Sequence, residues 1–154
     1  MLHVILHEPE IPPNTGNIIR LCANTGTQLH LIEPLGFALD DARLRRAGLD
    51  YREWARVEQH TDWRAFRRRY ADLPLWAFST RGTRTYVDAV FGPDDGLVFG
   101  PESRGLPTEL LEEIGVDRTL RLPMQARSRS LNLSNTVAVS LYEALRQQAF
   151  GGLV

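Results

Sequence analysis

Lysine is absent from the sequence, and all 18 basic residues are arginine. The phosphate-binding loop GxxxxGK(S/T) is therefore impossible, and no GxGxxG follows the first apolar run at Leu2–Leu6. These absences argue against a nucleoside triphosphate or a dinucleotide as the ligand. A ligand without a polyphosphate chain, held by loops, fits the sequence better.

Cysteine is almost absent: Cys22 is the single one, so no internal disulfide can form, which favours a reducing cytoplasm. Cys22 lies between apolar positions of an expected helix, where we predict an inert core thiol. No apolar run approaches the roughly 20 residues that span a bilayer. The N-terminus MLHVILHEPE lacks the basic region and cleavage site of a signal peptide. We therefore predict a cytoplasmic protein that does not associate with membranes.

Recognisable catalytic and metal-binding patterns are also missing. The four histidines stand at no metal-ligand spacing and there is no cysteine cluster, so the sequence predicts no metal site and structural roles for His3, His7, His30 and His60. No nucleophile elbow indicates Ser-His-Asp chemistry. Metal-dependent and serine hydrolases are thus disfavoured.

The net charge of −1 does not indicate a globally basic nucleic-acid binder. Arginines nevertheless cluster at Arg43–Arg46 and Arg67–Arg69, and single ones stand in expected loops at Arg81, Arg104 and Arg129. Some flank the site proposed below, where a local phosphate-binding patch can coexist with a neutral total charge. For Arg67–Arg69, a solvated helix face is the better interpretation.

Apolar strand-length runs alternate with helical patterns along the chain. Strands are expected at Leu2–Leu6, Gln28–Ile32, Leu75–Phe78, Gly96–Phe99 and Leu120–Leu122, with a minor one around Glu53–Val57. Helices are expected from Thr15 to Asn24 with Asn14 as cap, from Asp40 or Asp41 through Ala47, from Trp63 to Tyr70 with Asp62 as cap, and from Pro107. This alternation predicts an α/β fold whose mostly parallel sheet is covered by helices, as one domain over residues 1–154.

The segment Thr119–Arg146 organises the rest. A short strand stopped by Pro123 leads into a polar loop and then a long helix, opened by cap-competent residues such as Asn132 and closed by Gly151-Gly152. The apolar stripe of this helix is wider than one core contact needs. We therefore expect the loop to form a ligand site and the helix to form an interface.

Ligands of open α/β sheets bind beyond the carboxyl ends of the strands. Three breaks satisfy this rule here: Phe78–Thr80, Phe99–Glu102 and Leu122–Met124. Apolar walls and exposed backbone groups suit a flat heteroaromatic ring such as adenine. Any one of these breaks taken alone could be an ordinary strand-to-helix turn.

Three motifs converge on one family: PNTGNIIR (Pro13–Arg20), FGPESRGLP (Phe99–Pro107) and RLPMQARSRSLNLSNTVAVSLYEA (Arg121–Ala144). Together they resemble the SPOUT superfamily of RNA methyltransferases, in the branch that methylates ribose 2′-hydroxyls, over essentially the whole chain. The match is best to small bacterial tRNA (cytidine/uridine-2′-O-)-methyltransferases of the anticodon wobble nucleotide. The resemblance implies a C-terminal trefoil knot that binds S-adenosylmethionine, and a homodimer formed by the first and C-terminal helices.

The resemblance also implies site residues. The catalytic candidates are Arg20, Asn14, Glu102 and Asn132, and the cofactor candidates are Phe78, Gly100, Leu122, Met124 and Ser130. Arg127, Arg129 and Tyr142 are candidates for contact with tRNA. Arg20 would act as a base or as a clamp on the oxyanion or phosphate, and its high pKa favours the clamp. Glu102 could orient Arg20 or the loop, and Tyr142 could instead lie at the dimer interface or in the core.

Two rival functions remain. A ribosomal RNA ribose methyltransferase of the same fold would share the motifs, whereas a non-catalytic RNA-binding module would keep the arginines without needing the three loops together. The substrate expected from the resemblance is the wobble pyrimidine of leucine-type tRNAs.

Overall fold

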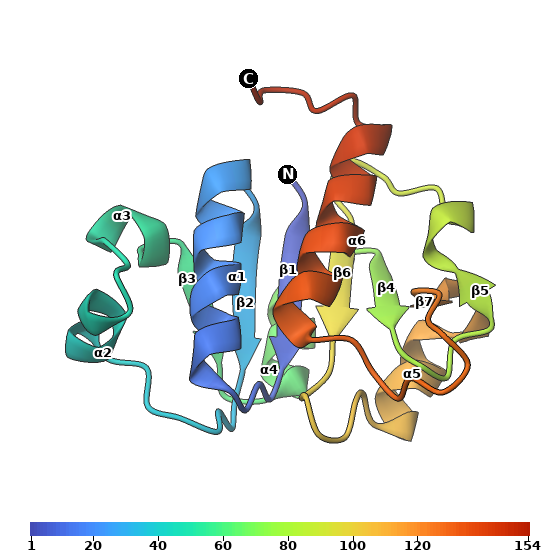
Figure 1. Cartoon of the computed structure of the whole chain (residues 1–154), viewed down its shortest axis with the longest axis horizontal. Coiled ribbons are helices and arrows are strands. Elements are labelled where there is room, and N and C mark those ends of the chain that lie inside the picture. The colour runs from blue at the N-terminus through green and yellow to red at the C-terminus, as the bar shows by residue number, and fades with distance from the viewer.

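The computed structural model describes residues 1–154, except for the side chain of Tyr51. Within this described part, seven strands form one sheet in the order β3-β2-β1-β6-β4-β7-β5, and every neighbouring pair is parallel. The strands are β1 His3–His7, β2 Gln28–Ile32, β3 Val57–His60, β4 Leu75–Phe78, β5 Arg84–Thr85, β6 Gly96–Phe99 and β7 Thr119–Arg121. The prediction of a parallel, helix-covered sheet is confirmed (Figure 1).

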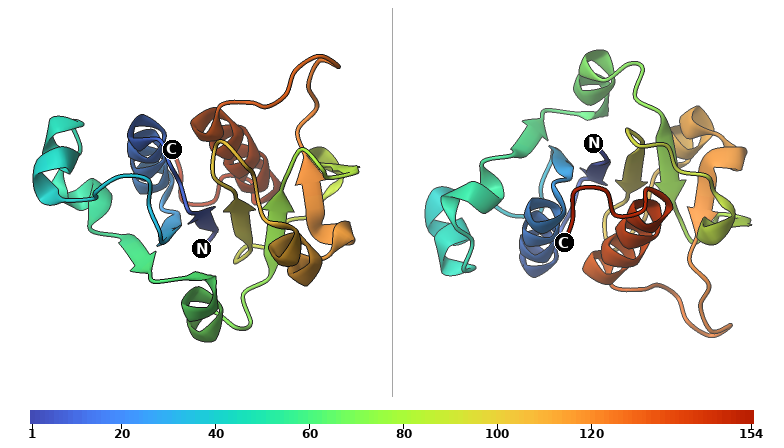
Figure 2. Two further views of the ribbon diagram at one scale, coloured as in Figure 1. Left: turned by 90° about the horizontal axis from the view of Figure 1, so that it is seen from below. Right: turned by 90° about the horizontal axis from the view of Figure 1, so that it is seen from above.

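The helices cover both faces of the sheet. They are α1 Pro12–Thr25, α2 Asp41–Arg46, α3 Tyr51–Trp54, α4 Trp63–Arg69, α5 Thr108–Ile114 and α6 Leu133–Gln147, with 3-10 turns η1 Tyr86–Asp88 and η2 Val116–Arg118. Figure 2 shows α1 and α6 side by side on one face, α4 and α5 on the other, and α2 with α3 beyond the β3 edge. None of the helices formed by described residues has the length and apolar character needed to cross a bilayer.

Two apolar cores follow from the alternation of side chains along the strands. Val4, Leu6, Leu29 and Leu31 point toward α1 and α6, and Ile5, Ile32, Ala77 and Val98 point toward α4 and α5. Val137, Leu141, Ala144 and Leu145 of α6 are buried in the first core, where Cys22 is also buried. Burial raises the pKa of the Cys22 thiol to about 12, as expected for an inert core residue.

Several predicted helix boundaries are wrong. Asn14 does not cap α1, because the helix already begins at Pro12, a residue type favoured in the first turn, and Ile11 is its N-cap. The long helix α6 ends at Gln147 rather than at Gly151-Gly152, since Ala149 and Phe150 adopt positive φ angles. The caps Asp40, Asp62 and Asn132 are confirmed by side-chain bonds to backbone N–H groups.

The strand expected at Glu53–Val57 is displaced: α3 runs through Trp54, and β3 begins at Val57. Strand β5 was not predicted at all, because two residues carry no periodicity. Its position matters for the site, since β7 lies between β4 and β5 in the sheet although β5 follows β4 in the chain.

The histidines are scattered in sequence but not in space. Paired residues of parallel strands point to the same side, so His30 of β2 shares a sheet face with its partner Glu58 and with His60 two residues later. His3 Nδ1 lies 2.9 Å from His30 Nε2, and His30 Nδ1 lies 3.1 Å from His60 Nε2. The sequence spacing of the histidines did not reveal this cluster, because it does not show which strands are neighbours in the sheet.

Candidate active site

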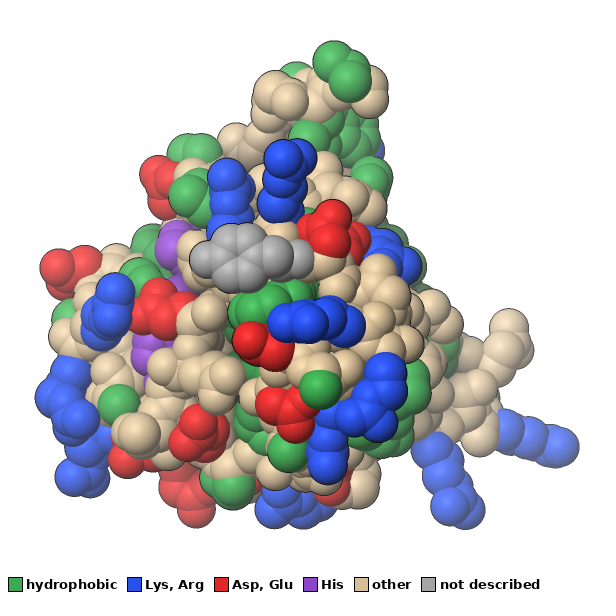
Figure 3. Space-filling view, turned by 90° about the vertical axis from the view of Figure 1, so that its left-hand side faces the viewer, with side chains coloured by type: hydrophobic (Ala, Val, Ile, Leu, Met, Phe, Trp, Pro, Cys, Tyr) green, Lys and Arg blue, Asp and Glu red, His purple; other side chains and the backbone are tan. Residues whose placement is uncertain are grey.

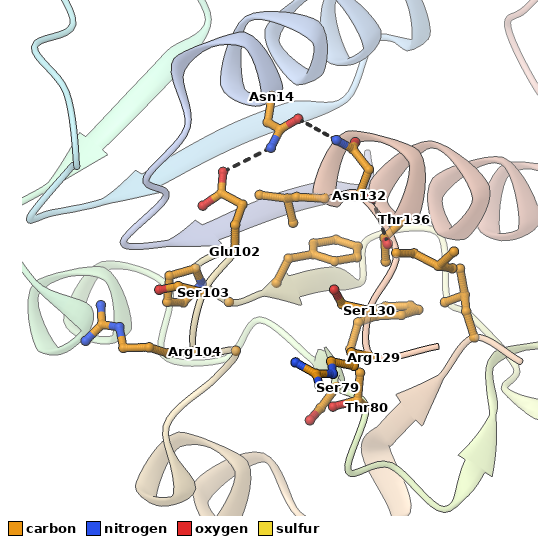
Figure 4. A pocket seen from close by; sticks show the side chains of 18 of the residues that line it. Asn14, Ser79, Thr80, Glu102, Ser103, Arg104, Arg129, Ser130, Asn132 and Thr136 are labelled. Carbon is orange, nitrogen blue, oxygen red and sulfur yellow. Dashed lines mark hydrogen bonds between the residues drawn. The ribbon is translucent and has the colours of Figure 1, made fainter. Parts of the chain in front are cut away.

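A cavity of about 510 Å³ opens beyond the carboxyl ends of β4, β6 and β7, where the strand-end rule places a ligand. Its walls come from the three predicted breaks and from the N-terminal ends of α1 and α6 (Figure 4). Nine of the twelve predicted site residues line it: Asn14, Phe78, Gly100, Glu102, Leu122, Met124, Arg129, Ser130 and Asn132. Arg20, Arg127 and Tyr142 do not.

The first wall is the turn after β4. Ser79 donates its backbone N–H to Leu120 of β7 at 2.9 Å, and Gly82 closes the turn by donating to Ser79 O at 3.0 Å. A Cβ atom on Gly82 would lie 2.7 Å from the Leu120 carbonyl carbon, so glycine is needed for this close approach. Arg81 then ties the turn to the next wall by donating to Leu106 O at 2.6 Å and to Thr108 Oγ1 at 3.1 Å. Arg81 was not predicted as a site residue.

The second wall is the turn Gly100–Leu106 after β6. A Cβ atom on Gly100 would lie 2.3 Å from Leu106 N, a separation that real structures do not tolerate. The turn is attached to the segment before α1 by the Ser103 backbone N–H and hydroxyl, both of which donate to Glu10 Oε1. These bonds lower the pKa of Glu10, the backbone N–H contributing most. The turn is thereby held rigid on both sides.

A chain of polar side chains joins α6, α1 and this turn (Figure 4). Asn132 donates to Asn14 Oδ1 at 3.0 Å, and Asn14 donates to Glu102 Oε1 at 3.3 Å. Glu102 also accepts the backbone N–H groups of Glu10 at 2.8 Å and Ile11 at 3.1 Å. The Glu102 carboxylate thus accepts backbone N–H groups at the N-terminal end of α1, where the N-cap residue makes no side-chain hydrogen bond. The network fixes one rim of the cavity.

Comparison with known proteins identifies the family. The model of the SpoU rRNA Methylase family matches residues 1–142. The chain belongs to this family. A relative from Saccharophagus degradans, named tRNA (cytidine(34)-2′-O)-methyltransferase, is 60% identical over 152 residues, which cover 99% of each chain.

Solved structures of SpoU-type methyltransferases have the same fold. One, described as "Structural insights into the 2-OH methylation of C/U34 on tRNA", superposes with a TM-score of 0.87 at 46% identity and covers 97% of each chain. An AdoMet-bound rRNA methyltransferase from Sinorhizobium meliloti gives a TM-score of 0.82 at 26% identity, over 94% of this chain and 56% of the other.

Arg20 of this SpoU methylase lies outside the cavity, on the solvent side of α1. Its side chain is half exposed and donates through Nε to Glu53 Oε1 at 2.9 Å and through Nη2 to Gly48 O. Glu53 is itself fixed, since its Oε2 accepts the Asp50 N–H at 2.7 Å and its own N–H donates to Asp50 Oδ1. Of the two roles expected for Glu102, it does not orient Arg20 within its own subunit, where Glu53 is the partner of Arg20, but it does hold the loop before α1.

The remaining candidates lie in exposed places. Arg127 and Arg129 belong to the exposed loop between β7 and α6, and only Arg129 reaches the cavity. Tyr142 is 48% exposed on α6 near Phe150, which contradicts a core role. Ile11, Ser103, Arg104 and Thr136 also line the cavity and were not predicted, because their positions depend on chain crossings that periodicity does not reveal.

The Glu102 carboxylate is expected to stabilise the site as a structural acceptor. In Glu102→Gln the new amide would face the donors of Glu10, Ile11 and Asn14, leaving at least one of them unpaired. We expect a loss of about 1–3 kcal/mol in the free energy of unfolding and weaker cofactor binding. Urea unfolding and calorimetry measure the two effects. Glu112→Gln, an exposed carboxylate on α5, is the matched control, and equal behaviour of both variants would contradict the assignment.

Proposed function

We propose that this protein is an S-adenosylmethionine-dependent methyltransferase that modifies the ribose 2′-hydroxyl of the wobble nucleotide, position 34, of tRNA. The substrate nucleotide is cytidine or a modified uridine, in tRNAs of the leucine type. The observation that carries the proposal is the 60% sequence identity, over 99% of each chain, with a protein named tRNA (cytidine(34)-2′-O)-methyltransferase. The three motifs of this chain contribute residues to one cavity.

The cavity fits S-adenosylmethionine. Its volume lies within the usual range for small-molecule sites. Phe78, Leu122 and Met124 supply apolar walls, while the turns after β4 and β6 present backbone polar groups; Gly100 and Ser130 complete the proposed cofactor contacts. When bound, this cofactor supplies an electrophilic methyl group. No polyphosphate-binding motif is needed for it, which agrees with the absence of lysine.

The chain's own task is to position the ribose and to stabilise negative charge that develops on its 2′-oxygen. We assign this stabilisation to the Arg20 guanidinium, acting on the oxyanion or on a neighbouring phosphate. The hydrogen bond that Arg20 donates to the Glu53 carboxylate raises the pKa of Arg20 further above its ordinary value, which opposes a role as base. We assign Arg127 and Arg129, which stand in the exposed loop before α6, to contacts with phosphates of the anticodon arm.

Because Arg20 does not reach the cavity of its own subunit, we propose that it serves the cavity of a partner subunit. Ile11 and Leu131 at the cavity rim, Val139 and Tyr142 on α6, and Phe150 beyond the end of α6 are large apolar side chains that are 41–48% exposed. They supply a surface for a homodimer in which α1 and α6 of two copies pack together. Within this assembly the enzyme works in the cytoplasm, where tRNA is found.

We also propose the trefoil knot. Strand β7 pairs with both β4 and β5, so it occupies the space enclosed by the connection between those strands. The close approach of Gly82 to Leu120 agrees with this threading. Residues 1–154 then form one catalytic domain.

Dimerisation should depend on the exposed face of α6. We expect Val139→Asp to convert the dimer to a monomer, because burying the new carboxylate without a partner is costly. The rate of methyl transfer should also fall, because in a monomer Arg20 has no cavity of a partner subunit to act on. Light scattering coupled to gel filtration gives the mass, and Val116→Asp, a 69% exposed valine of η2, is the control. A wild-type monomer with full activity would refute the shared site.

The proposed reaction is tested by incubating the protein with labelled S-adenosylmethionine and bulk tRNA from a strain that lacks the gene. Nucleoside mass spectrometry and mapping should find a 2′-O-methylated pyrimidine at position 34. Ribosomal RNA, tested in parallel, should stay unlabelled. Labelling of ribosomal RNA alone would favour the other ribose methyltransferase, and failure to bind the cofactor would favour the RNA-binding module.

A further inference from the structure

Away from the cavity, polar side chains gather under α4 at the β2–β3 edge of the sheet. His30 is fully buried and His60 is 7% exposed, and both point to the face that carries Glu58. His30 Nδ1, His60 Nε2 and a Glu58 carboxylate oxygen all lie within 4.8 Å of one another. The proposed methyl transfer uses none of these residues.

The separations match a tetrahedral metal site. With metal–nitrogen bonds of about 2.0–2.1 Å, ligand atoms of a tetrahedral site stand roughly 3.3 Å apart. His30 Nδ1 and His60 Nε2 are 3.1 Å apart; His30 Nδ1 lies 3.8 Å from Glu58 Oε2, and His60 Nε2 lies 3.8 Å from Glu58 Oε1. Small rotations of the side chains bring all three lone pairs onto one point. Two imidazoles and one carboxylate form a donor set that zinc uses, with a fourth position for water.

The surrounding groups orient these ligands. In the metal-bound form His30 donates its Nε2–H to His3 Nδ1 at 2.9 Å, with the two rings nearly coplanar at 15°, which leaves Nδ1 free to coordinate. Tyr70 O–H donates to Glu58 Oε2 at 2.6 Å. Such outer hydrogen bonds fix the tautomer and the carboxylate of metal ligands.

One oxygen of the Glu58 carboxylate accepts no hydrogen bond from the described residues. This oxygen, Oε1, is buried, although the Arg69 Nε atom forms an ion pair with it at 3.0 Å. Arg69 is 68% exposed and can move into solvent when a cation arrives.

We infer that His30, Glu58 and His60 form a binding site for a divalent transition metal of the zinc type, which fastens the edge strand β3 to β2. The site stands on the edge of the sheet, so an ion can enter without opening the core. Figure 3, which faces the side of the molecule that carries α2, α3 and the β3 edge, shows histidine atoms among acidic and arginine side chains. The site is separate from the proposed cofactor cavity and independent of the methyl transfer.

Cobalt spectroscopy tests the site directly. The full-length protein is freed of metal with a chelator and titrated with Co²⁺, and then Zn²⁺ is added. One equivalent of Co²⁺ should give the visible absorption of a four-coordinate ion, which Zn²⁺ abolishes. Zn²⁺ should also raise the melting temperature of the wild-type protein. Absence of saturable Co²⁺ binding would refute the site.

Four variants locate the ion. Glu58→Gln and His60→Gln should each weaken Co²⁺ binding at least about 10-fold, whereas His7→Gln, a buried imidazole outside the cluster, should leave it unchanged. Arg69→Gln should strengthen binding, because a competing cation is removed without disturbing the core. Circular dichroism in chelator checks that each variant folds. Wild-type affinity in Arg69→Gln, or in both ligand variants, would contradict the assignment.

Discussion

Replacing Arg20 with alanine should lower kcat by about 10²–10³-fold, the usual cost of removing a donor that stabilises a developing oxyanion. The dimer and the affinity for S-adenosylmethionine should remain nearly unchanged, because Arg20 does not line the cavity of its own subunit, is not among the buried residues of α1, and acts in the proposal on the RNA and not on the cofactor. Single-turnover methyl transfer and calorimetry measure the two quantities. Wild-type turnover in this variant would remove Arg20 from the mechanism.

The environment of Arg20 allows a finer test. The Glu53 carboxylate accepts a hydrogen bond from Arg20 Nε and is itself fixed by the Asp50 N–H. Glu53→Gln should therefore keep Arg20 charged but leave its guanidinium poorly oriented. We expect a smaller fall in kcat than for Arg20→Ala, with little effect on cofactor binding. Arg68→Ala, which removes an exposed arginine from α4 on the opposite face of the sheet, is the control for loss of charge alone.

The sequence was most informative where chemistry and periodicity coincide. Apolar runs bounded by Pro or Gly located the strands whose ends build the cavity, and the caps Asp40, Asp62 and Asn132 were predictable because their side-chain chemistry is local. The cavity residues at the three breaks followed from one rule about strand ends. The roles assigned to them still depend on the resemblance and on the experiments proposed here.

The sequence was least informative where distant strands decide the contacts. Nothing in the spacing of His3, His30 and His60 reveals that β1, β2 and β3 are neighbours. Similarly, Glu53 became the partner of Arg20 because α3 packs beside α1, whereas the motif suggested Glu102. Asn14 lines the cavity as predicted, but it does not cap α1, because the helix already begins at Pro12.

Gly100→Ala should raise the dissociation constant for S-adenosylmethionine by roughly 10- to 100-fold, the equivalent of about 1–3 kcal/mol of overpacking. Gly100 has no positive φ angle, so the backbone conformation itself permits alanine. The obstacle is steric: the added Cβ would lie 2.3 Å from Leu106 N and 2.4 Å from the Gly105 carbonyl carbon, both rigid backbone atoms. The turn must therefore open toward the cavity.

Gly151→Ala is the matched control, because its Cβ would lie an ordinary 3.6 Å from Gln148 O, beyond the end of α6 and outside the cavity. Calorimetric titration with the cofactor compares the two variants, and thermal melts establish that both fold. If Gly100→Ala bound the cofactor like the wild type, the turn after β6 could not be a wall of the cofactor site. If both variants lost affinity equally, the effect would reflect general destabilisation. Selective loss in Gly100→Ala would instead tie cofactor binding to the close backbone approach that Gly100 allows in the turn after β6.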